Sequence, residues 1–88
     1  MPTISIFLGF VVQMHWREHP PPHVHVLYQG FEALIEIETG GIIAGELPPG
    51  ALRIIRAWVE RRRTELFANW ELGRQKQPFE RVPGADIE

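Results

Sequence analysis

The chain has 88 residues, a formal net charge of −2 and 44% hydrophobic residues, a size and composition that suit one small globular domain with a modest core. It contains no cysteine, which excludes disulfides, thiolate metal ligands and cysteine nucleophiles. No apolar run reaches the roughly 18 residues that a membrane span needs, and the N-terminus does not resemble a signal peptide. We therefore expect a soluble, cytoplasmic protein with a single α+β domain over residues 1–88.

The first 46 residues predict an antiparallel β-meander. Five segments are typical of strands, most of them alternating apolar side chains with others, and turn signals such as Gln29-Gly30 and Gly40-Gly41 separate them. Strands that follow one another through short turns pair antiparallel. The expected strands are residues 3–7, 10–17, 23–28, 31–38 and 42–44.

From Ala51 the apolar period changes from that of a strand to that of a helix, and the helical pattern continues to about Arg74. The apolar side chains form one stripe along this segment: Leu52, Ile55, Trp58, Val59, Leu66 and Trp70. Prolines and a glycine then predict an irregular tail over residues 75–88. The expected fold is a four- or five-stranded antiparallel meander (1–46) with one long helix (51–74) packed on one face.

All four histidines lie within the eleven residues from His15 to His25, around the run His19-Pro20-Pro21-Pro22-His23-Val24-His25. The prolines predict a stiff, extended approach to the third strand. Strand alternation then places His23 and His25 on the same face. The pattern predicts a pair of imidazoles, with His15 and His19 as further candidates.

Three interpretations of this cluster stay open. The first is a divalent-metal site whose ligands come from His15, His19, His23 and His25, completed by a glutamate or water. The second is a nuclease in which His23 and His25 act as general acid and base. The third is a solvated strand face that only supports the fold or contacts a partner.

The predicted helix also carries candidate binding residues. Arg56 and Arg63 project beside Leu52 and Trp70 of the apolar stripe rather than opposite them. Arginine next to tryptophan is typical of protein interfaces. The alternative is a nucleic-acid surface, for which the candidates are Arg53, Arg56, Arg61, Arg62 and Arg63.

Several segments together resemble a bacterial family, the domain of unknown function numbered 4160. They are Met1-Pro2-Thr3-Ile4, the His-Pro-Pro-Pro-His-Val-His run with Tyr28, residues 41–48, Trp58, Glu65-Leu66 and Asn69-Trp70-Glu71.

The resemblance implies a small α+β protein, often encoded beside a second short protein as in a toxin-antitoxin or small regulatory pair. It also implies shared surface residues at His23, His25 and Tyr28. It supplies no activity, so enzyme and binding module both remain open. We expect a small protein partner or a second copy of the chain, and the partner-binding candidates are Arg56, Arg63, Trp58, Trp70 and Tyr28.

Overall fold

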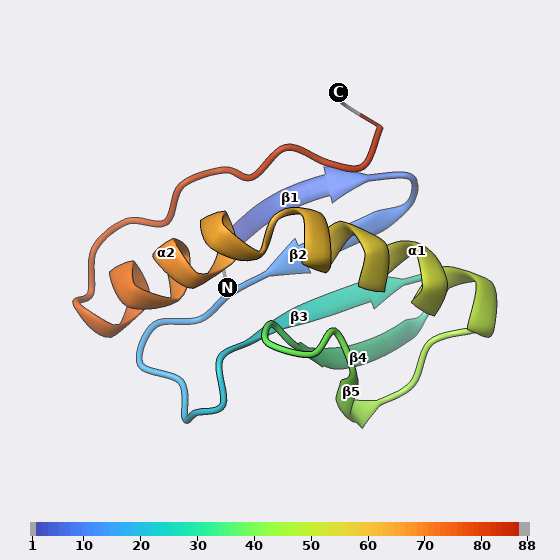
Figure 1. The fold of residues 1–88 in the computed structure, drawn as a ribbon, viewed down its shortest axis with the longest axis horizontal. Helices are drawn as coiled ribbons and strands as arrows, with labels where there is room; N and C mark the ends of the chain where they lie inside the picture. Colours follow the sequence, from blue (N-terminus) through green and yellow to red (C-terminus); the bar gives the residue numbers. More distant parts are fainter. Residues whose placement is uncertain (1, 87–88) are drawn as a thin grey trace.

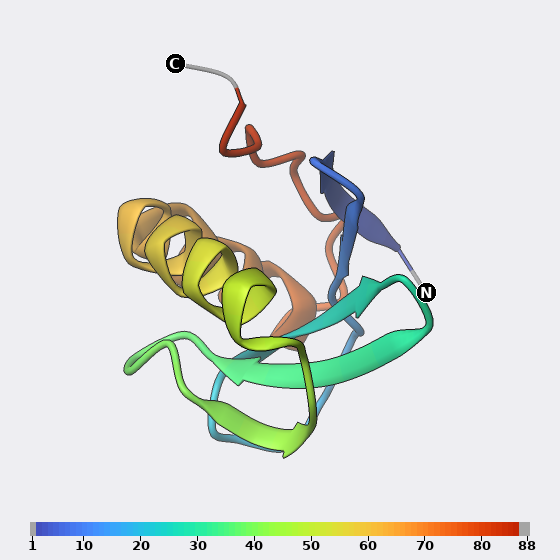
Figure 2. The same cartoon turned by 90° about the vertical axis from the view of Figure 1, so that its right-hand side faces the viewer.

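The computed structural model describes residues 2–86, which form one antiparallel sheet of five strands and two helices. The strands follow chain order across the sheet, β1-β2-β3-β4-β5, and both helices pack on one face (Figures 1 and 2). This confirms the predicted α+β class and the meander. The elements are β1 (Thr3–Phe7), β2 (Phe10–Gln13), β3 (His23–Tyr28), β4 (Phe31–Glu36), β5 (Ile42–Gly45), α1 (Pro49–Arg61) and α2 (Arg63–Arg74).

Two tight turns set the register of the β1–β2 pair and of the β3–β4 pair. Leu8-Gly9 joins β1 to β2 and Gln29-Gly30 joins β3 to β4, and all four residues have positive φ, between 48° and 85°. Two-residue turns with this backbone match the twist of the strands that they join, and glycine adopts it without steric cost. The conformation of these turns fixes how the paired strands align, and so which of their side chains face the helices.

The core lies between the sheet and the helices. Alternate residues of the central strands, among them Val12, Val24 and Val26, are fully buried, and Trp58 of α1 packs on Phe7 with ring centroids 5.0 Å apart. Burial of these apolar surfaces is the main favourable term in the folding of the domain.

The predicted single helix over residues 51–74 is wrong in one respect, because the segment forms two helices that meet at Arg62. Arg62 departs from helical geometry (φ −107°, ψ 17°), although its N–H still donates to the Trp58 carbonyl at 2.9 Å. The next residue, Arg63, donates from Nε to the Ile37 carbonyl of the sheet layer at 2.9 Å. This tertiary contact coincides with the break, and local helical periodicity carries no signal of it.

The segment after α2 runs back across the molecule to β1 (Figure 1). Val82 N–H donates to the Ile4 carbonyl at 2.8 Å, and Trp58 Nε1–H donates to the Pro83 carbonyl at 2.9 Å. Asn69, which is 1% exposed, donates to the Glu80 carbonyl and accepts from the Glu80 N–H, both at 2.8 Å. Residues 75–86 are thus tied to both layers, and residues 87–88 of the predicted tail lie outside the described part of the chain.

We expect Asn69→Ala to lower the free energy of unfolding by about 1–3 kcal/mol, because it removes two part-buried hydrogen bonds between the Asn69 side chain and the Glu80 backbone. Urea denaturation followed by circular dichroism measures the change. Thr64→Ala, at an exposed position of the same helix, is the control and should shift stability by no more than about 0.5 kcal/mol. Equal stability of Asn69→Ala and wild type would contradict a stabilising role for the two hydrogen bonds between Asn69 and Glu80, which we call the clamp.

Candidate functional site

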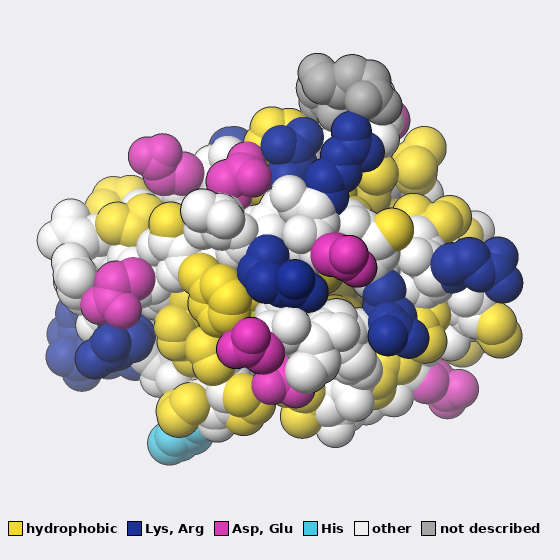
Figure 3. All heavy atoms as spheres, viewed as in Figure 1, with side chains coloured by type: hydrophobic (Ala, Val, Ile, Leu, Met, Phe, Trp, Pro, Cys, Tyr) yellow, Lys and Arg dark blue, Asp and Glu magenta, His cyan; other side chains and the backbone are white. Residues whose placement is uncertain are grey.

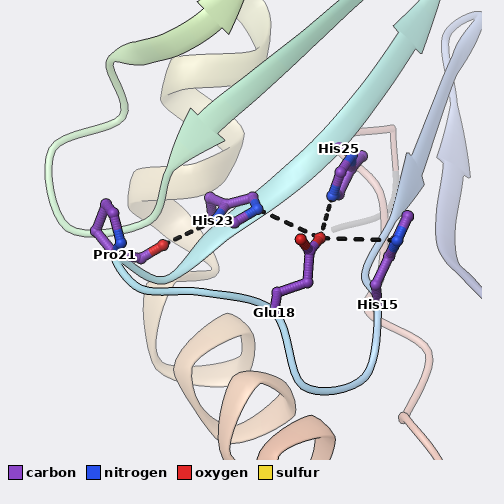
Figure 4. Close-up of polar contacts among 5 residues, drawn as sticks. All are labelled: His15, Glu18, Pro21, His23 and His25. Atoms are coloured by element: carbon purple, nitrogen blue, oxygen red, sulfur yellow. Dashed lines mark hydrogen bonds and ion pairs between the residues drawn. The ribbon is translucent and has the colours of Figure 1, made fainter.

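Three of the four histidines converge on one carboxylate oxygen, Oε1 of Glu18 (Figure 4). His25 Nε2 contacts this oxygen directly, His23 Nε2 lies 3.3 Å from it, and His15 Nδ1 lies 3.7 Å from it. His15 and Glu18 lie in the loop after β2, and His23 and His25 lie at the start of β3. They form a compact group, which we call the His–Glu cluster (His15, Glu18, His23 and His25).

The loop between β2 and β3 is held at several points, and these contacts position Glu18. Arg17 N–H donates to the Gly73 carbonyl at the end of α2 at 3.3 Å, and Ile37 N–H donates to the Pro22 carbonyl at 3.0 Å. The proline run therefore enters β3 beside the end of β4. Strand alternation then directs His25 away from the buried Val24 and Val26.

The orientation of His23 is fixed by its second ring nitrogen. His23 Nδ1 lies 2.8 Å from the Pro21 carbonyl oxygen, and because a carbonyl only accepts hydrogen bonds, Nδ1 carries the proton. His23 is 6% exposed as a whole residue, and its ring packs against Trp70 of α2, with centroids 5.3 Å apart. In neutral His23 the free lone pair on Nε2 consequently faces Glu18.

The rings of His15 and His25 are stacked, with centroids 4.0 Å apart and planes inclined by 12°. Burial lowers the pKa of His15, and the neighbouring positive charge of His25 lowers it further, against the opposing effect of the Glu18 carboxylate. For Glu18, burial raises the pKa, but the hydrogen bond from His25 and the charges of the three histidines outweigh it and lower the pKa overall. Glu18 is therefore ionised at neutral pH.

Several polar atoms around the cluster are buried without a hydrogen-bond partner among residues 2–86: His15 Nε2, His23 Nε2 and Gln13 Oε1. Gln13 lies opposite His25 in the β2–β3 register, so its side chain borders the cluster. Buried polar atoms without partners are uncommon in folded proteins. In addition, ligand atoms of His15, Glu18 and His25 all lie within 4.8 Å of one another, which is compact enough to hold a metal ion.

The structure thus brings together three of the predicted candidates and leaves out the fourth, His19, which is exposed and takes no part in the cluster. Sequence reasoning did not identify Glu18. The signal available was its position, as the acidic residue inside the eleven-residue window that holds every histidine.

The candidate partner residues occupy different environments. Trp58 and Trp70 are 1% and 9% exposed, so they belong mainly to the core. Tyr28 is half-buried and stacks on Phe10 at 4.4 Å, whereas Arg63 is bonded to the Ile37 carbonyl. Arg56 is exposed and passes over Gly40.

The candidate nucleic-acid residues lie on the two helices. Arg53, Arg56 and Arg61 are exposed, and Arg62 and Arg63 are half-buried. Arg62 forms an ion pair with Glu65 at 3.4 Å. Among residues 2–86, no helix combines the length and apolar character needed to cross a membrane.

Comparison with curated proteins and with solved structures gives no match. The model of a protein family, described as a domain of unknown function (DUF4160), matches residues 9–71. The matched region includes the whole His–Glu cluster, strands β2 to β5 and most of both helices. Because the match covers more than half of the chain, this protein belongs to the DUF4160 family.

Proposed function

We propose that this protein is a cytoplasmic partner-binding module, one component of a toxin-antitoxin-like or small regulatory pair. The observation that carries the proposal is an apolar sheet face that the helices leave uncovered. Both helices lie on the other face (Figure 2). A sheet face that meets only water normally presents polar side chains, so an apolar one suggests a binding surface.

Cross-strand register identifies the residues of this uncovered face. Ile6 pairs with Val11, Val11 with Leu27, and Leu27 with Glu32, and directly opposed residues share a face. Ile6 is 60% exposed, and Val11 and Leu27 are half-buried. The next row contains Gln13, His25, Leu34 and Ala44. We call these two rows the open face.

The charge of the open face favours a partner of different sequence over a second copy. None of the strand residues is Lys or Arg, and Glu32 lies within the face, with Glu36 at its end opposite His23. Two open faces placed together would bring like charges into contact. A partner with an apolar centre and flanking basic side chains is complementary.

The charged residues of the helices support a protein partner more than a nucleic acid. On the helix side of the molecule, Lys and Arg side chains are separated by acidic and uncharged ones rather than joined in a continuous stripe (Figure 3). A continuous basic stripe is the expected footprint of a phosphate-backbone binder. The pI of about 6.1 points the same way.

The family resemblance implies a small protein encoded beside this chain, and we expect such a protein to bind it with micromolar or tighter affinity. Ile6→Glu should weaken binding at least about tenfold, because it places a charge in the apolar contact. Isothermal titration calorimetry with both purified proteins measures the affinity. Ile54→Glu, at a 42% exposed isoleucine of α1, is the matched control and should bind like wild type.

Absence of binding at micromolar concentration would count against the proposal, as would equal losses in the two variants. Light scattering on the isolated chain tests the charge argument, which predicts a monomer. A dimer abolished by Ile6→Glu would assign the open face to a second copy instead.

The convergence of His15, His23 and His25 on Glu18 favours a second candidate, a histidine-based or metal-dependent nuclease. Both forms of this activity need the cluster, so the double variant His23→Ala/His25→Ala should lose cleavage of RNA or DNA while its circular dichroism spectrum is unchanged. Release of labelled fragments is the measurement, made with and without added divalent metal. A wild-type protein inactive on both substrates under all these conditions would exclude the nuclease.

A further inference from the structure

We infer that the His–Glu cluster is a binding site for one divalent transition-metal ion of the zinc class. The ligands are His15 Nδ1, Glu18 Oε1 and His25 Nε2, whose ligand atoms all lie within 4.8 Å of one another. His23 Nε2 lies outside that group but 3.3 Å from Glu18 Oε1, and it becomes the fourth ligand when the side chains close around the ion. This assignment does not depend on partner binding. It rests on spacing, on the direction of lone pairs and on the unsatisfied polar atoms of the cluster.

The distances from Glu18 Oε1 to two of the ring nitrogens are close to those of tetrahedral coordination. Zinc bonds of 2.0–2.1 Å arranged tetrahedrally place neighbouring ligand atoms about 3.3–3.4 Å apart. Glu18 Oε1 lies 3.3 Å from His23 Nε2 and 3.7 Å from His15 Nδ1. The direct contact between His25 Nε2 and Glu18 needs only a side-chain rotation to admit an ion, and Glu18 is on a loop.

When His23 is neutral, the lone pair on its Nε2 is directed at the Glu18 carboxylate. The bond from His23 Nδ1 to the Pro21 carbonyl leaves Nε2 of neutral His23 without a proton, facing an ionised carboxylate oxygen. Two acceptors in that position repel unless a proton or a metal ion lies between them. A backbone carbonyl bonded to the second ring nitrogen is also the usual support of a metal-bound histidine.

A single carboxylate oxygen does not satisfy three imidazoles. It offers about two lone pairs for hydrogen bonds, yet three ring nitrogens lie around Glu18 Oε1. One of them, His23 Nε2, is buried without a hydrogen bond, and its side chain is 7% exposed. A metal ion held by His15, Glu18 and His25 would give the Nε2 of His23 a partner as well, once the side chains close around it.

The donor set selects the type of metal. Imidazole suits zinc, copper, nickel and iron, whereas Mg²⁺ and Ca²⁺ prefer shells made of oxygen. Three imidazoles with one carboxylate therefore exclude a magnesium site. The side chains of His15 and Glu18 are 27% and 23% exposed, which gives the ion a path from solvent.

The experiment is a competition titration of the full chain with Zn²⁺ and a chromophoric chelator at pH 7. Wild type should bind one Zn²⁺ per chain with micromolar or tighter affinity, unaffected by millimolar Mg²⁺. His15→Ala, His25→Ala and Glu18→Gln should each weaken binding by about 100-fold or more, at least the loss typical of a second-shell change. His19→Ala removes the exposed histidine and should bind like wild type.

Circular dichroism and melting curves without metal identify any variant that fails to fold. Only the variants that fold are used to test the zinc site, and Glu18→Gln is the substitution that changes the side chain least. Co²⁺ absorption gives a second readout, because visible bands of tetrahedral intensity should appear in wild type and in His19→Ala and be lost in the other variants. No zinc binding by wild type would overturn the assignment and leave a proton-bridged cluster. Equal binding by wild type and His25→Ala, or loss of binding in His19→Ala, would also overturn it.

Discussion

The two helices can cover only one face of the sheet, and this constraint determines where the core forms and which surface stays open. A five-stranded sheet has two faces, and the two helices, which share one rod-like path (Figure 1), cover one of them. All the buried strand valines belong to the covered face, so the core is a single layer between Val12, Val26 and the helical Trp58 and Val59. The second face, the open face, is consequently the sheet surface that is available for contacts with other molecules.

The His–Glu cluster lies at the boundary between these two environments. His23 reaches Trp70 of α2, whereas His25 belongs to the open face, opposite Gln13 and Leu34. The cluster is therefore supported from the core side and bordered by the apolar rows on the other. A cation bound there would place positive charge beside the acidic Glu36, which lies opposite His23, and would alter the charge that a partner meets.

Local sequence signals predicted much of the fold, because they arise within single elements. Alternation assigned Phe10, Val12, Met14 and Trp16 to one face. The first three are buried, whereas Trp16 is 46% exposed, because the strand ends at Gln13. Gln29-Gly30 predicted a turn, and both residues have positive φ. The break at Arg62 and the clamp between Asn69 and Glu80 join segments distant in sequence or space, and neither propensity nor periodicity reports such contacts.

The candidate site, like the fold, was predictable only where it depends on signals within a single element. The pairing of His23 with His25 follows from the strand period of two, whereas the role of Glu18 depends on how the loop folds back over β3. That path is set by contacts with other elements, chiefly Arg17 with Gly73 and Pro22 with Ile37.

The cluster thus combines local and distant contributions. Its four side chains come from eleven consecutive residues, so the hairpin of β2 and β3 brings them close with little loop-closure entropy. Their final geometry, however, depends on the docking of α2, because Trp70 packs on His23 and Gly73 accepts the hydrogen bond from Arg17. The same helix carries Asn69, which holds residues 75–86 against the sheet. Loosening that clamp would weaken the packing of α2 on the sheet and, through it, the orientation of His23.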